Sequence, residues 1–154
     1  SNGYIRLEDA NYALDDATGP SQERSVLIAG IAYTNNTNMV VLEKGSNLHF
    51  VVQTNGSSNA GKMSWRLGGL SVNNVFTTSP LNDGMPRNML FHWKNETNGQ
   101  RIFIDGELDA YRTIAESPPV DDNNDFVIGS RFGSYTFPGT LEGVFVFARG
   151  TTVE

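Results

Sequence analysis

Short runs of apolar and β-branched residues recur along this 154-residue chain, and turn-forming residues separate them. No stretch keeps a helical period over three turns, and segments 13–19 and 113–117 each suit one helical turn at most. Turn-bounded runs of this length are typical of β-strands. We predict strands at 25–33, 38–45, 47–53, 62–67, 72–76, 88–93, 101–105, 107–112, 125–131 and 140–148.

Many short strands without helices favour two packed antiparallel sheets. The run 62–67 supports this interpretation, because Met63, Trp65 and Leu67 alternate with polar residues and so share one face of a strand. We therefore expect an all-β fold, a two-sheet antiparallel β-sandwich of the jelly-roll type. No internal repeat or low-complexity linker divides the sequence, and its length suits one domain over residues 1–154.

The stretch RIFIDGELDAY places carboxylates at every second position, at Asp105, Glu107 and Asp109. On one straight strand they would share a face and form a catalytic cluster. Asp-Gly between two strand-like runs is instead among the strongest signals for a two-residue hairpin, because both turn positions must accept a positive φ. We expect Asp105 and Gly106 to form the turn, which would separate the three side chains.

The overall charge and composition exclude several classes of function. The formal net charge of −6 argues against nucleic acid as a partner, because an acidic surface repels phosphates. No apolar run approaches the roughly 18 residues of a membrane-spanning helix. Cysteine is absent, which excludes disulfides and thiolate metal sites. The opening Ser1-Asn2-Gly3 is typical of a cloning remnant, so we expect a piece excised from a longer protein.

The second half of the chain has an ordered set of motifs. A strand ends near a Trp, an apolar strand ends in Asp-Gly, another ends in Gly, and Phe-x-Gly precedes a final apolar strand. The stretches are LFHWKNETNGQRIFIDGEL (90–108), DFVIGSR (125–131) and FPGTLEGVFVFARG (137–150). In this order they resemble the concanavalin A-like lectin/glucanase superfamily, in particular its laminin-G-like and pentraxin-like domains. The resemblance implies a concanavalin A-like jelly roll.

The resembling superfamily contains both lectins and enzymes. Its laminarinase-type enzymes carry Glu-x-Asp-x-x-Glu on one strand, with one carboxylate as the nucleophile and another as the acid/base. That motif is absent here, and Arg112 stands where the second Glu would follow Glu107 and Asp109. We expect a non-catalytic binding module rather than a glycoside hydrolase or polysaccharide lyase.

Glycan recognition usually combines an exposed aromatic ring with amide, carboxylate or guanidinium groups. The candidate ligand-binding residues are Asn35, Asn36, Trp65, Arg66, Tyr111, Arg112 and Tyr135. Trp65 has a second interpretation as a core residue, because it alternates with Met63 and Leu67. Tyr135 follows Gly133 and Ser134, which favours an exposed position.

Calcium is the one cofactor that we consider. Asp121, Asp122 and Asp125 offer the oxygen ligands that Ca²⁺ prefers, and related lectin-like domains often hold calcium at a loop edge. The simpler interpretation of the same residues is a solvated loop after Pro118-Pro119, in which Asn and Asp cap turns.

Two strand-like runs, 101–104 and 144–147, are apolar on both faces, although one face of a two-layer sandwich should be solvated. A loop, a third small sheet or another subunit of a homo-oligomer would have to cover the outer face. As the main function we expect recognition of a glycan on a cell, matrix or virion surface. The alternative is a structural attachment or decoration domain of a virion, phage tail or surface fibre, which would contact protein.

Overall fold

The computed structural model describes residues 5–7, 23–35, 39–44, 48–52, 58–67, 74–94, 96–113, 125–131 and 135–147. Segment 13–19 and residues 114–117, where we predicted helical turns, lie outside this part. Asn36, Asp121 and Asp122 also lie outside it.

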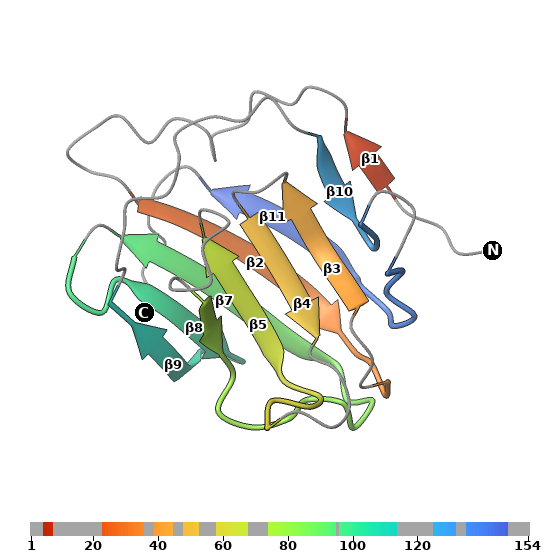
Figure 1. The fold of residues 1–154 in the computed structure, drawn as a ribbon, viewed down its shortest axis with the longest axis horizontal. Helices are drawn as coiled ribbons and strands as arrows, with labels where there is room; N and C mark the ends of the chain where they lie inside the picture. The colour runs from red at the N-terminus through yellow and green to blue at the C-terminus, as the bar shows by residue number, and fades with distance from the viewer. Residues whose placement is uncertain are drawn as a thin grey trace.

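The described part of the chain consists of strands and connecting turns (Figure 1). The strands are β1 (Ile5–Leu7), β2 (Glu23–Ile31), β3 (Met39–Lys44), β4 (Leu48–Val52), β5 (Met63–Leu67), β6 (Asn74–Phe76), β7 (Arg87–Lys94), β8 (Gln100–Ile104), β9 (Glu107–Arg112), β10 (Phe126–Ile128) and β11 (Gly143–Phe147). Each predicted strand is present within a few residues of its expected ends. The three-residue β1 was not predicted, because so short a run carries no periodicity.

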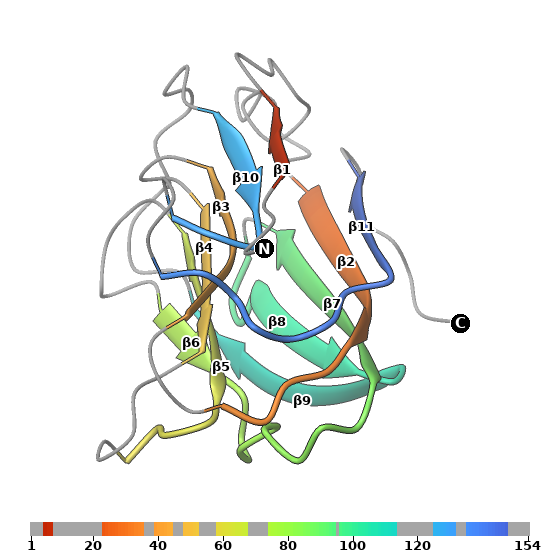
Figure 2. The same ribbon diagram turned by 90° about the vertical axis from the view of Figure 1, so that its right-hand side faces the viewer.

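The strands form two antiparallel sheets that lie face to face (Figure 2). Among the described residues, a six-stranded sheet has the order β1-β10-β3-β4-β5-β6 and a five-stranded sheet has the order β11-β2-β7-β8-β9. The predicted two-sheet β-sandwich is therefore confirmed.

Alternating side chains from both sheets fill the space between the layers. Val26 and Ile28 of β2 and Met89 and Phe91 of β7 point inward, because every second residue of a strand faces the same side. Phe91 meets Trp65 of the opposite sheet edge to face, with ring centroids 5.6 Å apart. The interior thus joins the two sheets through aromatic and aliphatic contacts.

The Phe-x-Gly motif has a structural role at the start of the last strand. The ring of Phe137 packs edge-on against Tyr33, with centroids 6.0 Å apart. A Cβ at Gly139 would lie 2.3 Å from the carbonyl oxygen of Ala32, so only glycine permits this close approach. Thr140 and Ala32 then exchange two backbone hydrogen bonds, of 3.1 and 2.9 Å. The motif aligns β11 beside β2.

Asp105 and Gly106 form the predicted turn between β8 and β9, with φ angles of 50° and 90°. The Asp105 side chain also has a specific role, because its Oδ1 accepts a hydrogen bond from the Asn88 amide at 2.8 Å. The Asp105 amide donates in return to the Asn88 carbonyl at 2.8 Å. These two bonds attach the turn to β7, the neighbouring strand.

Candidate functional site

The three carboxylates of the RIFIDGELDAY stretch do not form a catalytic cluster. Asp105 lies in the turn, and Glu107 begins the returning strand. The register between β8 and β9 shifts after Glu107 and Leu108, so Asp109 occupies a bulge. Its carboxylate accepts hydrogen bonds from the backbone amide of Thr78 at 2.9 Å and the hydroxyl at 2.6 Å. Each acid therefore has a different environment.

Trp65 corrects one prediction, because it belongs to the core rather than to a glycan-binding surface. Its side chain is 2% exposed and packs against Phe91. A sugar ring cannot stack on an indole whose faces are already covered by protein. The alternation with Met63 and Leu67, which pointed to the core, was the better guide.

Tyr111 and Arg112 lie on β9, an edge strand of the five-stranded sheet. Tyr111 is 58% exposed. Arg112 reaches across to the other layer, where its Nη1 donates to the Asn74 carbonyl of β6 at 2.8 Å. Arg112 thus joins the two sheets at one edge of the sandwich and does not share a site with Tyr135.

Polar residues occupy one register line across the six-stranded sheet on every strand except β10, where Val127 lies. Arg6 of β1 and Glu43 of β3 both pair with Val127 of β10. The same line continues through His49, Arg66 and Asn74, on β4, β5 and β6. We call Arg6, Glu43, Arg66 and Asn74, with the register position of His49, the polar row.

The polar row lies on the outer face of the sheet. Leu42 and Trp65 precede Glu43 and Arg66 in their strands and are buried in the core. Neighbouring residues of a strand point to opposite faces, so Glu43 and Arg66 point away from the interior. Strand alternation therefore places the polar row on the outer face of the six-stranded sheet.

Glu43 is the unusual member of the row, because its residue is only 1% exposed although it faces outward. Arg131, whose side chain is 48% exposed, places its Nε 3.4 Å from Oε1 of Glu43. Burial raises the pKa of Glu43, while the positive charges of Arg131 and Arg66 act in the opposite direction. The site therefore joins a desolvated carboxylate to two guanidinium groups, one of which is open to solvent.

Tyr135 is the exposed aromatic residue next to this sheet. Its carbonyl accepts a hydrogen bond from the Val40 amide at 2.9 Å, which attaches it to β3. Its φ of 53° lies in the left-handed region, which a non-glycine residue adopts at a cost in energy. The ring is 58% exposed, as its predicted place at the surface requires.

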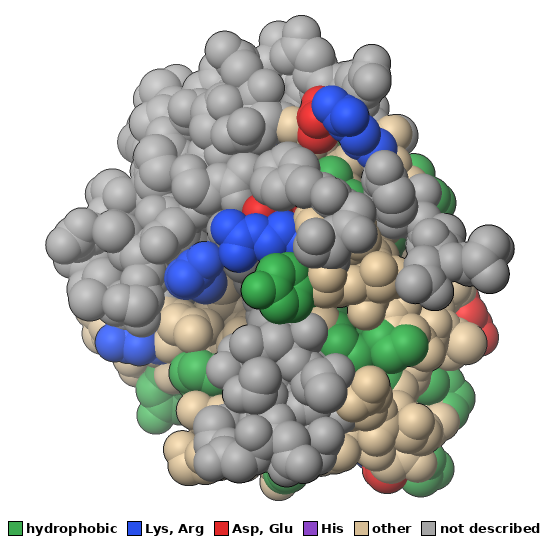
Figure 3. Space-filling model, turned by 45° about the vertical axis from the view of Figure 1, so that its right-hand side comes forward, with side chains coloured by type: hydrophobic (Ala, Val, Ile, Leu, Met, Phe, Trp, Pro, Cys, Tyr) green, Lys and Arg blue, Asp and Glu red, His purple; other side chains and the backbone are tan. Residues whose placement is uncertain are grey.

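The strand register fixes the spacing of these groups along and across the sheet. Arg66 lies two strands from Glu43, or about 10 Å at the usual strand separation. Val40, which anchors Tyr135, lies three residues along β3 from Glu43, again about 10 Å. Figure 3 views this sheet obliquely from the β1 side and shows Lys and Arg side chains gathered beside an acidic and a hydrophobic side chain.

The calcium candidate Asp125 lies at the edge of the same sheet, where it pairs with Arg6. Oδ2 of Asp125 accepts a hydrogen bond from the Arg6 Nε at 2.7 Å. A calcium ion at Asp125 would have to share that oxygen with a guanidinium. Among the residues that the structure describes, no three His, Asp or Glu side chains gather in a group suited to a metal ion.

Asn35, another candidate, is exposed and follows Tyr33 and Thr34 at the end of the segment after β2.

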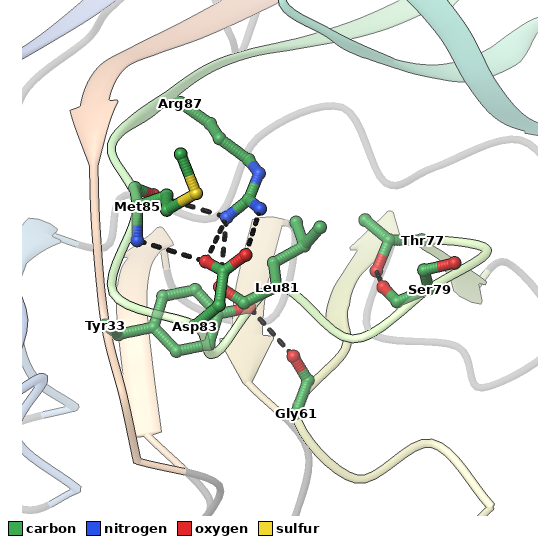
Figure 4. A network of polar contacts seen from close by, with 8 residues as sticks. All are labelled: Tyr33, Gly61, Thr77, Ser79, Leu81, Asp83, Met85 and Arg87. Carbon is green, nitrogen blue, oxygen red and sulfur yellow. Dashed lines mark hydrogen bonds and ion pairs between the residues drawn. The ribbon is translucent and has the colours of Figure 1, made fainter.

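A second polar cluster fixes the loop between β6 and β7 (Figure 4). The Asp83 carboxylate accepts hydrogen bonds from Arg87 Nη1 and Nη2 at 2.7 and 2.5 Å, and from the Met85 amide at 3.0 Å. These hydrogen bonds hold the pKa of Asp83 well below its usual range. Arg87 also donates to the carbonyls of Leu81 and Met85.

The loop is closed from the other side by Tyr33. Its hydroxyl donates to the Gly61 carbonyl at 2.9 Å, and burial raises its pKa. Its own carbonyl accepts a hydrogen bond from the Gly84 amide at 3.0 Å. Since the carboxylate and guanidinium already satisfy each other and the loop backbone, we assign this cluster a structural role.

Glu43 and Arg131 were not among the predicted site residues. Glu43 lies in a strand-like run, and nothing in the sequence near it marks a site. The available signal was a charged residue inside the apolar run MVVLEK, whose six residues are all buried in the structure. Its pairing with Arg131 depends on strand register, which the sequence alone does not give.

The comparisons with known proteins agree with this architecture. The model of the concanavalin A-like lectin/glucanases superfamily matches residues 10–154. No curated protein sequence matches the chain. A putative carbohydrate binding protein from Bacteroides ovatus superposes with a TM-score of 0.69 at 19% identity, over 88% of this chain and 40% of the other.

Two further solved structures have the same fold. Domains LG4-5 of the mouse laminin alpha1 chain give a TM-score of 0.62 at 10% identity, over 97% of this chain and 44% of the other. The binding domain of Botulinum Neurotoxin DC, in complex with SialylT, gives 0.67 at 9% identity, over 98% and 37%. This chain spans less than half the length of each of the three structures. By its family match over residues 10–154, the chain belongs to the concanavalin A-like lectin/glucanases superfamily.

Proposed function

We propose that this protein is a non-catalytic glycan-binding module whose site is the outer face of the six-stranded sheet. The observation that carries the proposal is that one sheet holds the Glu43–Arg131 ion pair, with Arg66 acting on the same carboxylate, and is bonded through Val40 to the exposed Tyr135. An exposed aromatic residue and guanidinium donors are groups that bind sugars. The site would act by preformed shape and hydrogen bonding, without covalent chemistry.

The charges of the site favour a saccharide that carries a carboxylate. Arg131 is half exposed, and Arg66 lies on the same face, while the acid between them is buried. A planar guanidinium binds a carboxylate with two parallel hydrogen bonds. The acidic ligand would therefore meet a locally cationic surface on a chain whose formal net charge is −6.

Two of the structural neighbours support this proposal. One is described as a putative carbohydrate binding protein, and another was solved in complex with SialylT. We also infer a place outside the cell, on a cell or matrix surface. The described segments include no helix long and apolar enough to cross a bilayer.

The environment of Glu43 does not suit glycoside hydrolysis. Retaining enzymes need a second carboxylate about 5–5.5 Å away. The charged groups that act on the pKa of Glu43 are instead Arg131 and Arg66. We therefore propose that Glu43, whose carboxylate is buried, orients Arg131 and Arg66 and does not itself contact the ligand.

The first prediction concerns binding. A glycan array that includes neutral, sialylated and uronic acid-containing glycans should show binding by the wild-type protein, strongest for the acidic glycans. Arg131→Ala and Tyr135→Ala should each weaken binding by about tenfold or more, since each loses roughly 1.5–3 kcal/mol of contact energy. Calorimetric titration with the best glycan of the array would measure the change.

The matched control is Tyr111→Ala, because Tyr111 is as exposed as Tyr135 but lies on the other sheet. Its affinity should equal that of the wild type. Failure of the wild type to bind any glycan, or an equal loss in Tyr111→Ala, would contradict the proposed site. Glu43→Gln should keep the fold, because burial already disfavours the charged form of this carboxyl group.

Calcium remains a proposal for Asp125 with Asp121 and Asp122. The array should be repeated with Ca²⁺ and with a chelator. Calcium-dependent binding that Asp125→Asn abolishes would support a metal site at this edge. Equal binding in both conditions would show that the polar row acts without the ion.

A structural attachment domain is the alternative function. Apolar side chains on the outer face of the five-stranded sheet favour it, because such a face suits contact with protein rather than with sugar hydroxyls. The two functions use opposite sheets, and variants of each sheet can test them separately.

A further inference from the structure

Apolar side chains form a continuous line across all five strands of the five-stranded sheet. The strand registers pair Phe145 with Leu27, Leu27 with Leu90, Leu90 with Phe103, and Phe103 with Leu108. We call these five residues the apolar stripe. It crosses the sheet from the edge strand β11 to the edge strand β9.

The stripe faces outward. The neighbours of its members, such as Val26 and Ile28 beside Leu27 and Met89 and Phe91 beside Leu90, are the buried core residues. Strand alternation therefore places the stripe on the opposite face. Phe145 and Leu108 at its two ends are each 51% exposed, and Leu27, Leu90 and Phe103 between them are partly exposed. An apolar line that reaches the surface along its whole length is a candidate contact site.

The order of residue sizes along the stripe is complementary to itself. From β11 to β9 the stripe reads Phe, Leu, Leu, Phe, Leu. Consider a second copy packed against this face and related by a two-fold axis that runs parallel to the strands. The order of its stripe is reversed, so each Phe lies opposite a Leu, and Leu90 lies opposite Leu90 of the second copy. A two-fold interface requires this kind of self-complementarity, because one patch must match itself.

The charges beside the stripe also permit a second copy. Lys94 Nζ lies 3.1 Å from Glu23 and 3.2 Å from Glu96, and Arg101 Nη2 lies 2.6 Å from Glu96. The charges of these two acidic and two basic side chains cancel within one chain, so this part of the face has no net charge. Two chains with a formal net charge of −6 each would repel across most surfaces, but not across one that is locally neutral.

The area of the whole face sets an upper limit on the dimer contact, because Ser25 and His92 on the same face are already buried within the chain. Five strands spaced about 4.8 Å apart and roughly 20 Å long present about 500 Å² per protomer in flat projection. Two such faces bury about 1,000 Å², which is the lower limit for a biological interface.

We propose that the apolar stripe is a self-association surface, through which two copies of this protein pack their five-stranded sheets face to face with Leu90 at the two-fold axis. The polar rows of the two copies would then face outward on opposite sides of the dimer. A multivalent glycan surface could engage both sites only if its geometry spans the pair.

Sedimentation velocity over a concentration series tests the proposal. The wild-type protein should show a reversible monomer–dimer equilibrium. Leu108→Lys and Phe145→Lys should each weaken dimerisation at least tenfold, and both positions are exposed enough to accept lysine without unfolding. Met85→Lys is the matched control, since Met85 is an exposed apolar residue away from the stripe, and it should dimerise like the wild type.

The absence of cysteine in the native chain allows the axis itself to be tested. With a short bismaleimide, Leu90→Cys should cross-link to itself efficiently, whereas Leu108→Cys should cross-link to Phe145→Cys but poorly to itself. The proposal would be overturned by a wild-type protein that stays monomeric at every concentration. It would also be overturned if Met85→Lys weakened dimerisation as much as the stripe variants do. Strong self-cross-linking of Leu108→Cys would overturn the axis.

Discussion

At the residue scale, a few backbone conformations decide how this sandwich turns and where it presents side chains. Asp105 and Gly106 both adopt a positive φ, and Asp105 also binds the Asn88 amide. Tyr135 adopts a positive φ as well, although it has a bulky side chain. The first pair follows from the local sequence, because Asp-Gly has an intrinsic preference for such turns. The conformation of Tyr135 instead depends on its hydrogen bond to Val40 of a distant strand.

Gly106→Ala should lower the free energy of unfolding by roughly 1–2 kcal/mol, because an L-residue is strained at this φ. No other atom lies within 4 Å of the added Cβ, so the loss would report the backbone alone. Urea unfolding followed by tryptophan fluorescence measures it. Gly106→Asn should lose less, since Asn tolerates the left-handed region better. An Ala variant as stable as the wild type would show that the turn can relax.

At the element scale, β9 closes one edge of the sandwich against β6. Two contacts make this closure, one from Asp109 to Thr78 and one from Arg112 to the Asn74 carbonyl. The bulge in β9 lies at Asp109, between the residues that pair with Ile102 and Phe103. The acid at position 109 thus serves packing between sheets, and its place in an alternating acidic pattern is coincidental.

Asp109→Ala should lower the free energy of unfolding by roughly 1 kcal/mol, because it removes two hydrogen bonds to a charged acceptor at a partly exposed position. Glu107→Ala is the control on the same strand. Its side chain is exposed, so we expect a change within about 0.5 kcal/mol. Chemical unfolding of both variants provides the comparison. Equal losses of stability in the two variants would mean that the negative charge on β9 matters, rather than the hydrogen bonds from Thr78 to Asp109.

At the scale of the whole molecule, the two outer faces differ in chemistry. One sheet carries the polar row, and the other carries the apolar stripe. His92 lies on the second face, where its Nδ1 is 3.1 Å from the Ser25 hydroxyl. Burial lowers its pKa, with a further contribution from Arg101. Lys94 acts in the same direction as Arg101, whereas Glu23 and Glu96 act against them.

The lowered pKa of His92 predicts a pH dependence. In the unfolded chain His92 has the ordinary histidine pKa of 6.5, so the unfolded chain binds the proton more readily than the folded protein does. The contribution of neutral His92 to stability is therefore complete above pH 6.5 and is lost as the pH falls toward the folded pKa. Thermal unfolding should show a smaller loss between pH 7 and about pH 5.5 in His92→Gln than in the wild type. Identical pH profiles would contradict the assignment.

The sequence alone was sufficient for the strands, the hairpin at Asp105-Gly106, the core position of Trp65 as one of two interpretations, and the superfamily. These features depend on residue alternation, turn preference and motif order, which are local or follow the chain directly. Glu43, Arg66 and Arg131 come together only because β3, β5 and the segment after β10 share one sheet. Likewise, the apolar stripe exists only once five strands have aligned their registers. Strand register and sheet order are set by the packing of distant segments, so the tertiary structure alone decided which polar groups meet and which apolar residues share the outer face of a sheet.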